Sequence, residues 1–99
     1  MSRFEISVTS KAQSDVAKLR GAIVFKYRAP LTAKRYLAGL NKKMQSLTVG
    51  ADAIQIDEEL SVQYGIEIRR VNYKEIAILY SIEDNMVYVH RIIPQSLVK

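Results

Sequence analysis

The last third of the chain alternates hydrophobic and polar residues in a pattern that predicts three β-strands. Runs of β-branched and aromatic residues extend over about Ile66–Val71, Ile76–Ile82 and Val87–Ile93. Such residues favour strands, and the two short polar breaks between the runs are typical of hairpin turns. We therefore expect an antiparallel three-stranded meander, whose second turn is the two-residue hairpin Asp84-Asn85.

This turn predicts which residues of the last two strands share a face of the sheet. The first face, which we expect helices to cover, carries Ile76, Ile78, Tyr80, Ile82, Val87, Val89 and Ile93. The second, which is mixed enough to be partly open, carries Ala77, Leu79, Ser81, Met86, Tyr88, His90 and Ile92. The expected pairs are Ile82 with Val87, Tyr80 with Val89 and Ile78 with Arg91. Arg91 thus falls on the apolar face, which leaves three alternatives: a β-bulge re-aims it, an acid pairs with it in the core, or the turn is displaced by one residue.

The first half of the chain predicts one strand and two helices. Phe4–Val8 alternates with period two, as a half-buried strand does. A capping box formed by Ser10 and Gln13 indicates the start of a helix, which ends before Pro30. A second apolar stripe of helical spacing covers about Leu31–Leu47. Because the connection is so short, the two helices should form an antiparallel hairpin.

Thr48–Tyr64 has the least regular pattern. A short extended piece is expected around Ile54 and Ile56, and Asp57-Glu58-Glu59 is interpreted as a solvated turn rather than a metal site. We expect no metal and no cofactor. The element order is β-α-α-β-β-β, which predicts an α+β fold with a helical hairpin packed on one face of a four-stranded, mainly antiparallel sheet. The first strand should join the meander, because its backbone groups need partners.

Composition narrows the class of protein without identifying its activity. Ninety-nine residues predict a single domain, 1–99, and the absence of cysteine excludes disulfides and thiolate metal sites. The N-terminus lacks a signal-peptide pattern and no apolar run approaches the ~20 residues of a membrane span, so we expect a cytoplasmic protein without a membrane partner. The net charge of +5 favours nucleic acid or an acidic protein as a partner.

Several strings along almost the whole chain carry a family resemblance. They are Ser10-x-Ala12-x-x-Asp15-Val16-x-x-Leu19, Ala33-x-x-Tyr36-Leu37-x-x-Leu40, Arg69-Arg70-Val71, Ile78-Leu79-Tyr80-Ser81-Ile82 and Val87-Tyr88-Val89-x-Arg91-Ile92. In order, length and charge the chain resembles the RelE/ParE superfamily, the plasmid-stabilisation toxins of type II toxin–antitoxin systems. The match rests on the whole pattern, since each string alone is unspecific.

The resemblance implies a toxin that either cleaves mRNA in the ribosomal A site, as RelE types do, or poisons DNA gyrase, as ParE types do. It also implies a cognate antitoxin that covers the active region. The tail Pro94–Lys99 lacks the histidine, arginine or tyrosine that many members carry after the last strand. This favours the gyrase branch over RNA cleavage, or the alternative of a non-catalytic binding module whose partner is an acidic antitoxin-like helix.

Candidate site residues follow from the resemblance and from the chemistry of phosphate. Arg91 matches the arginine on the last strand, and Arg69 or Arg70 matches the basic position on the first meander strand. A metal-independent endoribonuclease would use Arg91 and Arg69 for phosphate charge and His90 as general acid or base. Nucleic-acid contacts are expected from Arg70, Tyr73, Lys74 and Tyr88. Two of these residues also have a structural interpretation. His90 could be a merely exposed or structural side chain, and Tyr73 could be a turn residue that shields the core from solvent.

Overall fold

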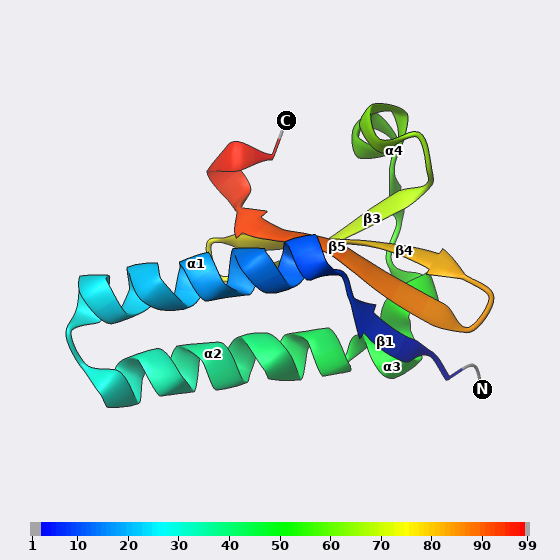
Figure 1. Ribbon diagram of the computed structural model, residues 1–99. Coiled ribbons are helices and arrows are strands. Elements are labelled where there is room, and N and C mark those ends of the chain that lie inside the picture. The colour runs from blue at the N-terminus through cyan, green and yellow to red at the C-terminus, as the bar shows by residue number, and fades with distance from the viewer. Residues whose placement is uncertain (1–2, 99) are drawn as a thin grey trace.

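A five-stranded mixed sheet lies at the centre of the computed structural model, which describes residues 3–98 (Figure 1). Its strand order is β1-β5-β4-β3-β2, and only the pairing of β1 with β5 is parallel among these strands. The strands are β1 (Glu5–Val8), β2 (Ile56–Asp57), β3 (Ile68–Tyr73), β4 (Ile76–Glu83) and β5 (Met86–Pro94). The predicted meander is confirmed, and the first strand joins it as expected. The expected number of four strands was wrong, because the short β2 adds a fifth.

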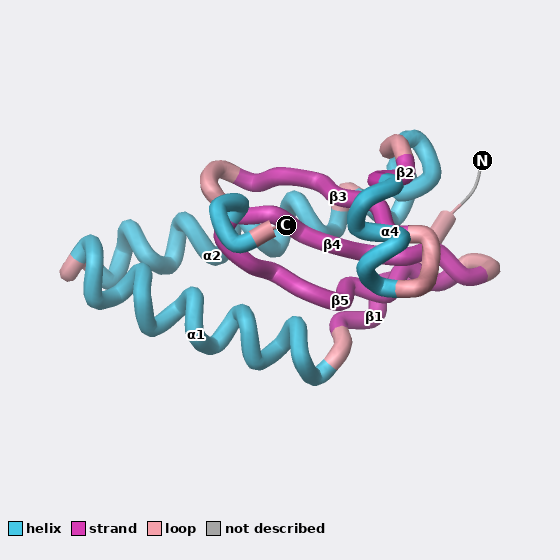
Figure 2. Tube along the Cα trace, turned by 90° about the horizontal axis from the view of Figure 1, so that it is seen from above, coloured by secondary structure: helices cyan, strands magenta, loops and turns pink. Residues whose placement is uncertain are grey.

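The two predicted helices form an antiparallel hairpin that extends well beyond the end of the sheet (Figures 1 and 2). They are α1 (Ser10–Tyr27) and α2 (Pro30–Gln45). The N-cap of α1 is Thr9 rather than the predicted Ser10, and its Oγ1 accepts a hydrogen bond from the N–H of Ala12. Within residues 3–98, neither these helices nor any other is long and apolar enough to cross a membrane.

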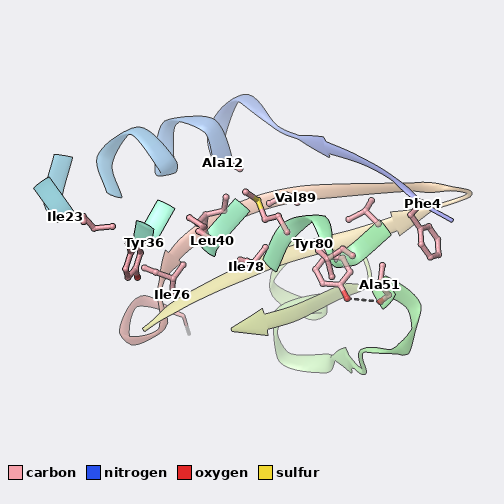
Figure 3. Packing of buried hydrophobic residues seen from close by; sticks show 14 of the residues in the cluster. Phe4, Ala12, Ile23, Tyr36, Leu40, Ala51, Ile76, Ile78, Tyr80 and Val89 are labelled. Carbon is pink, nitrogen blue, oxygen red and sulfur yellow. Dashed lines mark hydrogen bonds between the residues drawn. The ribbon is translucent and has the colours of Figure 1, made fainter. Parts of the chain in front are cut away.

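The helical hairpin covers one face of the sheet and encloses the main hydrophobic core (Figure 3). Its buried residues include Ala12 and Ile23 of α1, Ala33, Tyr36, Leu40 and Met44 of α2, and Ile76, Ile78, Tyr80, Val87, Val89 and Ile92 of the sheet. Tyr80 is fully buried and donates its hydroxyl hydrogen to the carbonyl of Ala51 at 2.7 Å. Burial raises the pKa of Tyr80 to about 12, so this hydroxyl stays protonated and serves the fold.

The stretch with the least regular pattern, Thr48–Tyr64, folds into short elements, of which the last packs on the other face of the sheet. After α3 (Leu47–Gly50) and the 3-10 turn η1 (Ala51–Ala53), β2 leads into α4 (Glu58–Tyr64). The acidic run is therefore a helix start and not the predicted turn: Asp57 Oδ1 accepts from the N–H of Leu60 at 3.0 Å. Leu60 and Tyr64 of α4 pack with Ile68, Ala77, Leu79, Ile93 and Val98 in a second, smaller cluster.

A β-bulge in β5 changes the predicted register in its second half. Tyr80 lies opposite Val89 as predicted, but Leu79 lies opposite Arg91, so His90 is the extra residue. The predicted pairing of Ile78 with Arg91 was wrong, because Ile78 lies opposite Ile92. Ile92 therefore joins the core below the helices, whereas Ile93 joins the smaller cluster. Of the three alternatives for Arg91, the bulge re-aims it, and an acid also pairs with it.

Candidate functional site

Two arginines lie in one row across the sheet face that points away from the helical hairpin. In this row Arg70 of β3 and Arg91 of β5 each lie opposite Leu79 of β4. Adjacent strands are ~4.8 Å apart, so the two arginine Cα atoms are roughly 10 Å apart. Arg69 points to the opposite face, as predicted for consecutive strand residues, so the row holds one residue of the Arg69-Arg70 pair.

Arg91 is held by Asp15, which projects from α1 at the point where β1 no longer covers the edge of β5. Its Nε donates to Asp15 Oδ2 at 2.7 Å and its Nη2 donates to Asp15 Oδ1 at 3.1 Å. The backbone N–H of Ile92 also donates to Asp15 Oδ2, at 3.0 Å. Burial alone would raise the pKa of Asp15, but the hydrogen bonds from Arg91 and Ile92 and the charge of Arg91 hold it below its usual value. Asp15 is therefore a carboxylate that neutralises Arg91.

His90 and Ser81 form a side-chain pair on the same sheet face. The distance from His90 Nε2 to Ser81 Oγ is 2.7 Å, and Ser81 is only 8% exposed. Burial lowers the pKa of His90, so its imidazole is neutral at pH 7. The pair ties the bulge of β5 to β4. Tyr88, half-buried, lies opposite Ser81 and is the aromatic residue closest in register to this pair.

The remaining basic residue expected in a catalytic role, Arg69, binds the backbone of the preceding segment. Its Nη1 donates to the carbonyl oxygens of Asp52 and Ile54. These bonds fix the loop that leads into β2 against the start of β3. The structure therefore separates Arg69 from Arg91 and His90.

Arg70 contacts the C-terminal turn η2 (Gln95–Leu97). Its Nε donates to Asn72 Oδ1 at 3.0 Å, and its Nη2 donates to Gln95 Oε1 at 3.3 Å. Gln95 Nε2 in turn donates to the carbonyl of Lys74 at 2.6 Å. Gln95 therefore links the arginine row to the turn between β3 and β4.

Tyr73 and Lys74 lie at that turn, against α2. Tyr73 donates its hydroxyl hydrogen to the carbonyl of Tyr36 at 3.0 Å, and the two rings meet edge to face with centroids 5.3 Å apart. Gly39 makes room for this contact, since a Cβ at that position would lie 2.2 Å from the Tyr73 hydroxyl. The ammonium of Lys74 lies 5.3 Å from the centroid of the Tyr36 ring. Tyr73 is thus packed against a helix, and Lys74 is the more exposed of the two.

A groove with a cavity volume of about 300 Å³ runs between α1 and the end of β5. We call it the α1–β5 groove, and it is lined by Asp15, Lys18, Leu19, Ala22, Arg91, Ile92, Ile93, Pro94 and Leu97. Leu97 is 63% exposed at its rim. The groove is mostly apolar, and its charged lining residues are Lys18 and the paired Arg91 and Asp15, which suits an apolar segment that carries an acidic residue near Lys18.

Sequence reasoning missed three residues that define these surfaces: Asp15, Ser81 and Gln95. Asp15 was part of a family string, and an acid for Arg91 was one of the alternatives, but nothing in the sequence connects positions 76 residues apart. Within residues 3–98, no group of three or more histidine, cysteine or acidic residues could hold a metal ion.

A five-stranded, mostly antiparallel sheet with a projecting helical hairpin is the fold of RelE/ParE-like toxins, and comparison with known proteins supports this class. Residues 6–97 match the family described as "ParE toxin of type II toxin-antitoxin system, parDE". The chain belongs to this ParE toxin family, and hence to a type II toxin–antitoxin system with a cognate antitoxin.

One similar solved structure is a chain of the chromosomal ParDE toxin–antitoxin system from P. aeruginosa. The TM-score is 0.75 at 14% sequence identity, and the similarity covers 93% of this chain and 96% of that chain. At this identity the likeness concerns the fold alone. No curated protein shows significant sequence similarity to the chain.

Proposed function

We propose that the protein inhibits DNA gyrase and that a ParD-type antitoxin neutralises it by covering the α1–β5 groove. The observation that carries the target is the family match over residues 6–97, since ParE toxins are typically gyrase inhibitors. The same family match supports the antitoxin, because toxins of this family form a pair with a cognate antitoxin.

The geometry of the basic residues favours a toxin that binds its target over one that cleaves mRNA. Cleavage of RNA needs a general base and a stabiliser of phosphate charge that converge on one point. The charge of Arg91 is neutralised by Asp15, and the neutral imidazole of His90 is engaged with Ser81. Arg69 is bound to backbone carbonyls on the other side of the sheet.

We assign target contact to the sheet face that carries Arg70, Arg91 and Tyr88. The Arg91 side chain remains 27% exposed, while its hydrogen bonds to Asp15 fix its orientation. Tyr88 is half-buried on the same face. A rigid arginine beside aromatic and apolar side chains is a common anchor of protein interfaces.

The antitoxin's place is supported by the shape and chemistry of the α1–β5 groove. Ala22 is exposed on its α1 side and Leu97 on its C-terminal side, so an amphipathic helix could bury both. Lys18 at the border attracts an acidic residue of the same helix, since Arg91 is already paired with Asp15.

A growth experiment tests the proposed target. The toxin is expressed in a bacterium without its antitoxin, and incorporation of labelled thymidine and labelled methionine is followed in parallel. Gyrase inhibition predicts that DNA synthesis stops first and that translation declines later. A stop in translation before DNA synthesis would favour mRNA cleavage, and unimpeded growth would favour the non-catalytic binding module.

Replacement of either of two exposed alanines by arginine tests the antitoxin site. Ala22→Arg fills the α1–β5 groove, whereas Ala38→Arg adds the same side chain to the outer face of α2, where Ala38 is also exposed. We expect Ala22→Arg to weaken antitoxin binding at least about tenfold, which is 1.4 kcal/mol or more, and Ala38→Arg to leave it within about twofold. Equal affinities for both variants, measured by titration calorimetry, would place the antitoxin elsewhere.

A further inference from the structure

The charges of this chain are distributed very unequally between the helical hairpin and the rest. Residues 16–51 contain eight basic side chains and no acidic one: Lys18, Arg20, Lys26, Arg28, Lys34, Arg35, Lys42 and Lys43. The other residues hold seven basic and ten acidic side chains, a net charge of −3. The positive net charge of the protein therefore comes entirely from the hairpin, which also projects beyond the sheet (Figure 1).

Three of these cations, Lys34, Arg35 and Lys42, share the outer face of α2. The buried residues of this helix are Ala33, Tyr36, Leu40 and Met44, and the three cations are exposed on the opposite side. Lys34 and Lys42 are separated by roughly 12 Å along the helix axis at 1.5 Å per residue. We call Lys34, Arg35 and Lys42 the α2 basic face.

A solvated helix face usually mixes both signs, because like charges one or two turns apart repel one another. On the α2 basic face this repulsion has no acid to offset it. Within residues 3–98 the one ion pair is Arg91–Asp15, which lies on α1 and β5. A polyanionic partner would remove the repulsion.

The α2 basic face continues into a pocket of about 360 Å³ at the turn between β3 and β4. Thr32, Arg35, Tyr36 and Lys74 line it. Arg35 and Lys74 bring two cations to it from different elements, and Thr32 offers a hydroxyl. Lys74 is oriented by the Tyr36 and Tyr73 rings, whose centroids lie 5.3 and 5.8 Å from its ammonium. Two cations and a hydroxyl around one concavity suit a phosphate group.

We infer that the α2 basic face and the Thr32–Lys74 pocket bind the phosphate backbone of duplex DNA. Nucleic acid fits this surface better than an acidic protein, because binding to phosphates needs only cations and hydrogen-bond donors. A protein interface needs apolar anchors, and between Lys34 and Lys42 the exposed side chains of α2 offer only Ala38 and Asn41. The separation of roughly 12 Å between Lys34 and Lys42 matches the width of the major groove, so the face can contact both strands.

The choice of DNA over RNA rests on the proposed function, because gyrase holds duplex DNA. Contact with that DNA would let the toxin bind gyrase and its substrate together. DNA binding by the toxin alone is measured without gyrase, so failure of this inference and failure of gyrase inhibition are separate results.

The test is fluorescence anisotropy of a labelled duplex of about 20 bp titrated with the purified toxin at several salt concentrations. Four phosphate contacts predict a slope of log K against log[salt] of about −3.6, or a loss of roughly 10²-fold between about 50 and 200 mM salt. The triple variant Lys34→Gln, Arg35→Gln, Lys42→Gln should reduce the slope to about −1 and weaken binding more than about tenfold at the lower salt concentration.

The matched control is the triple variant Arg3→Gln, Lys11→Gln, Arg20→Gln, which removes the same charge from exposed positions outside α2. We expect its slope to stay close to that of the unmodified protein. A second measurement needs no variant: duplex DNA should protect Lys34 and Lys42 from acetylation, and leave Lys11 reactive.

Three results would overturn the inference. The first is no detectable binding at about 50 µM protein in low salt, which is within the usual range of non-specific DNA affinity. The second is an equal loss in both triple variants, which would mean that net charge alone attracts DNA. The third is a variant of the α2 basic face that loses antitoxin affinity and keeps DNA affinity, which would assign the surface to an acidic protein.

Discussion

Replacement of Asp15 by alanine should destabilise the protein more than its position on a surface helix suggests. Asp15 accepts one hydrogen bond from the backbone N–H of Ile92 and two from Arg91. Ile92 is 2% exposed, so the substitution removes the acceptor of a buried N–H. An unsatisfied buried donor costs about 1–3 kcal/mol.

The ion pair itself adds less, because solvent reaches Arg91. With 27% of its side chain exposed, Arg91 can exchange Asp15 for water, so we count only about 1 kcal/mol for this pair. The expected loss for Asp15→Ala is therefore about 2–4 kcal/mol. Asp15→Asn should cost roughly half as much, because the carboxamide oxygen still accepts from the N–H of Ile92.

Urea unfolding followed by circular dichroism measures this loss. At a slope of about 1–2 kcal/mol per molar urea, the midpoint of Asp15→Ala should fall by at least about 1 M. Glu83→Ala is the control, since it removes an exposed acid and should change the free energy of unfolding by less than about 0.5 kcal/mol. A midpoint of Asp15→Ala within about 0.3 M of the control would mean that Asp15 contributes little to the stability of the fold.

Three further predictions concern the packing and the pH response of the fold. Gly39→Ala should destabilise by about 1–3 kcal/mol, because its Cβ displaces the Tyr73 hydroxyl, whereas Gly21→Ala, with nothing within 4 Å, should stabilise by up to about 1 kcal/mol. Thermal unfolding of both variants measures this difference, and equal changes in the unfolding midpoint would contradict the close contact between Gly39 and Tyr73. Ile78→Ala, in the fully buried centre of β4, should cost about 2–4 kcal/mol in urea, and an unchanged midpoint would contradict its core position. The pKa of His90 lies below 6.5 in the folded state, so stability is full above pH 6.5 and falls as the pH drops towards the folded pKa. His90→Gln should abolish that part of the slope between pH 7.5 and 5, and an unaltered slope would assign it to another group.

The local patterns were enough to predict the helical hairpin and the meander. The apolar stripes of α1 and α2 and the turn at Asp84-Asn85 depend on residues close in sequence, and periodicity detects them. The position of the N-cap at Thr9, one residue before the predicted Ser10, depends on a contact with the sheet. Thr9 donates its N–H to the carbonyl of Val89, which extends the strand conformation to Thr9 and moves the helix start by one residue.

The bulge at His90 could be named in advance only as one of three alternatives. The bulge is accompanied by contacts between α1 and β5, above all the hydrogen bond from the N–H of Ile92 to the carboxylate of Asp15. A one-residue shift moves every later side chain to the opposite face, so Ile92 and Ile93 exchange the positions that the sequence predicts.

The candidate site was predicted as residue types and not as an arrangement. The sequence could not distinguish Arg69 from Arg70, yet Arg69 binds carbonyls of the preceding segment and Arg70 is part of the arginine row. Tyr73 was expected at an open hairpin tip, and the structure packs it against Gly39 of α2. Lys34, Arg35 and Lys42 were not among the predicted site residues, because their common sign stands out only when the absence of acids over residues 16–51 is considered.

The proposed inhibition of gyrase is tested by a supercoiling assay with purified gyrase, relaxed plasmid and the purified toxin, with and without its cognate antitoxin. We expect the toxin to reduce supercoiling in a dose-dependent manner and an equimolar amount of antitoxin to restore it. Undiminished supercoiling at toxin concentrations that arrest growth would contradict the assignment of gyrase as the target.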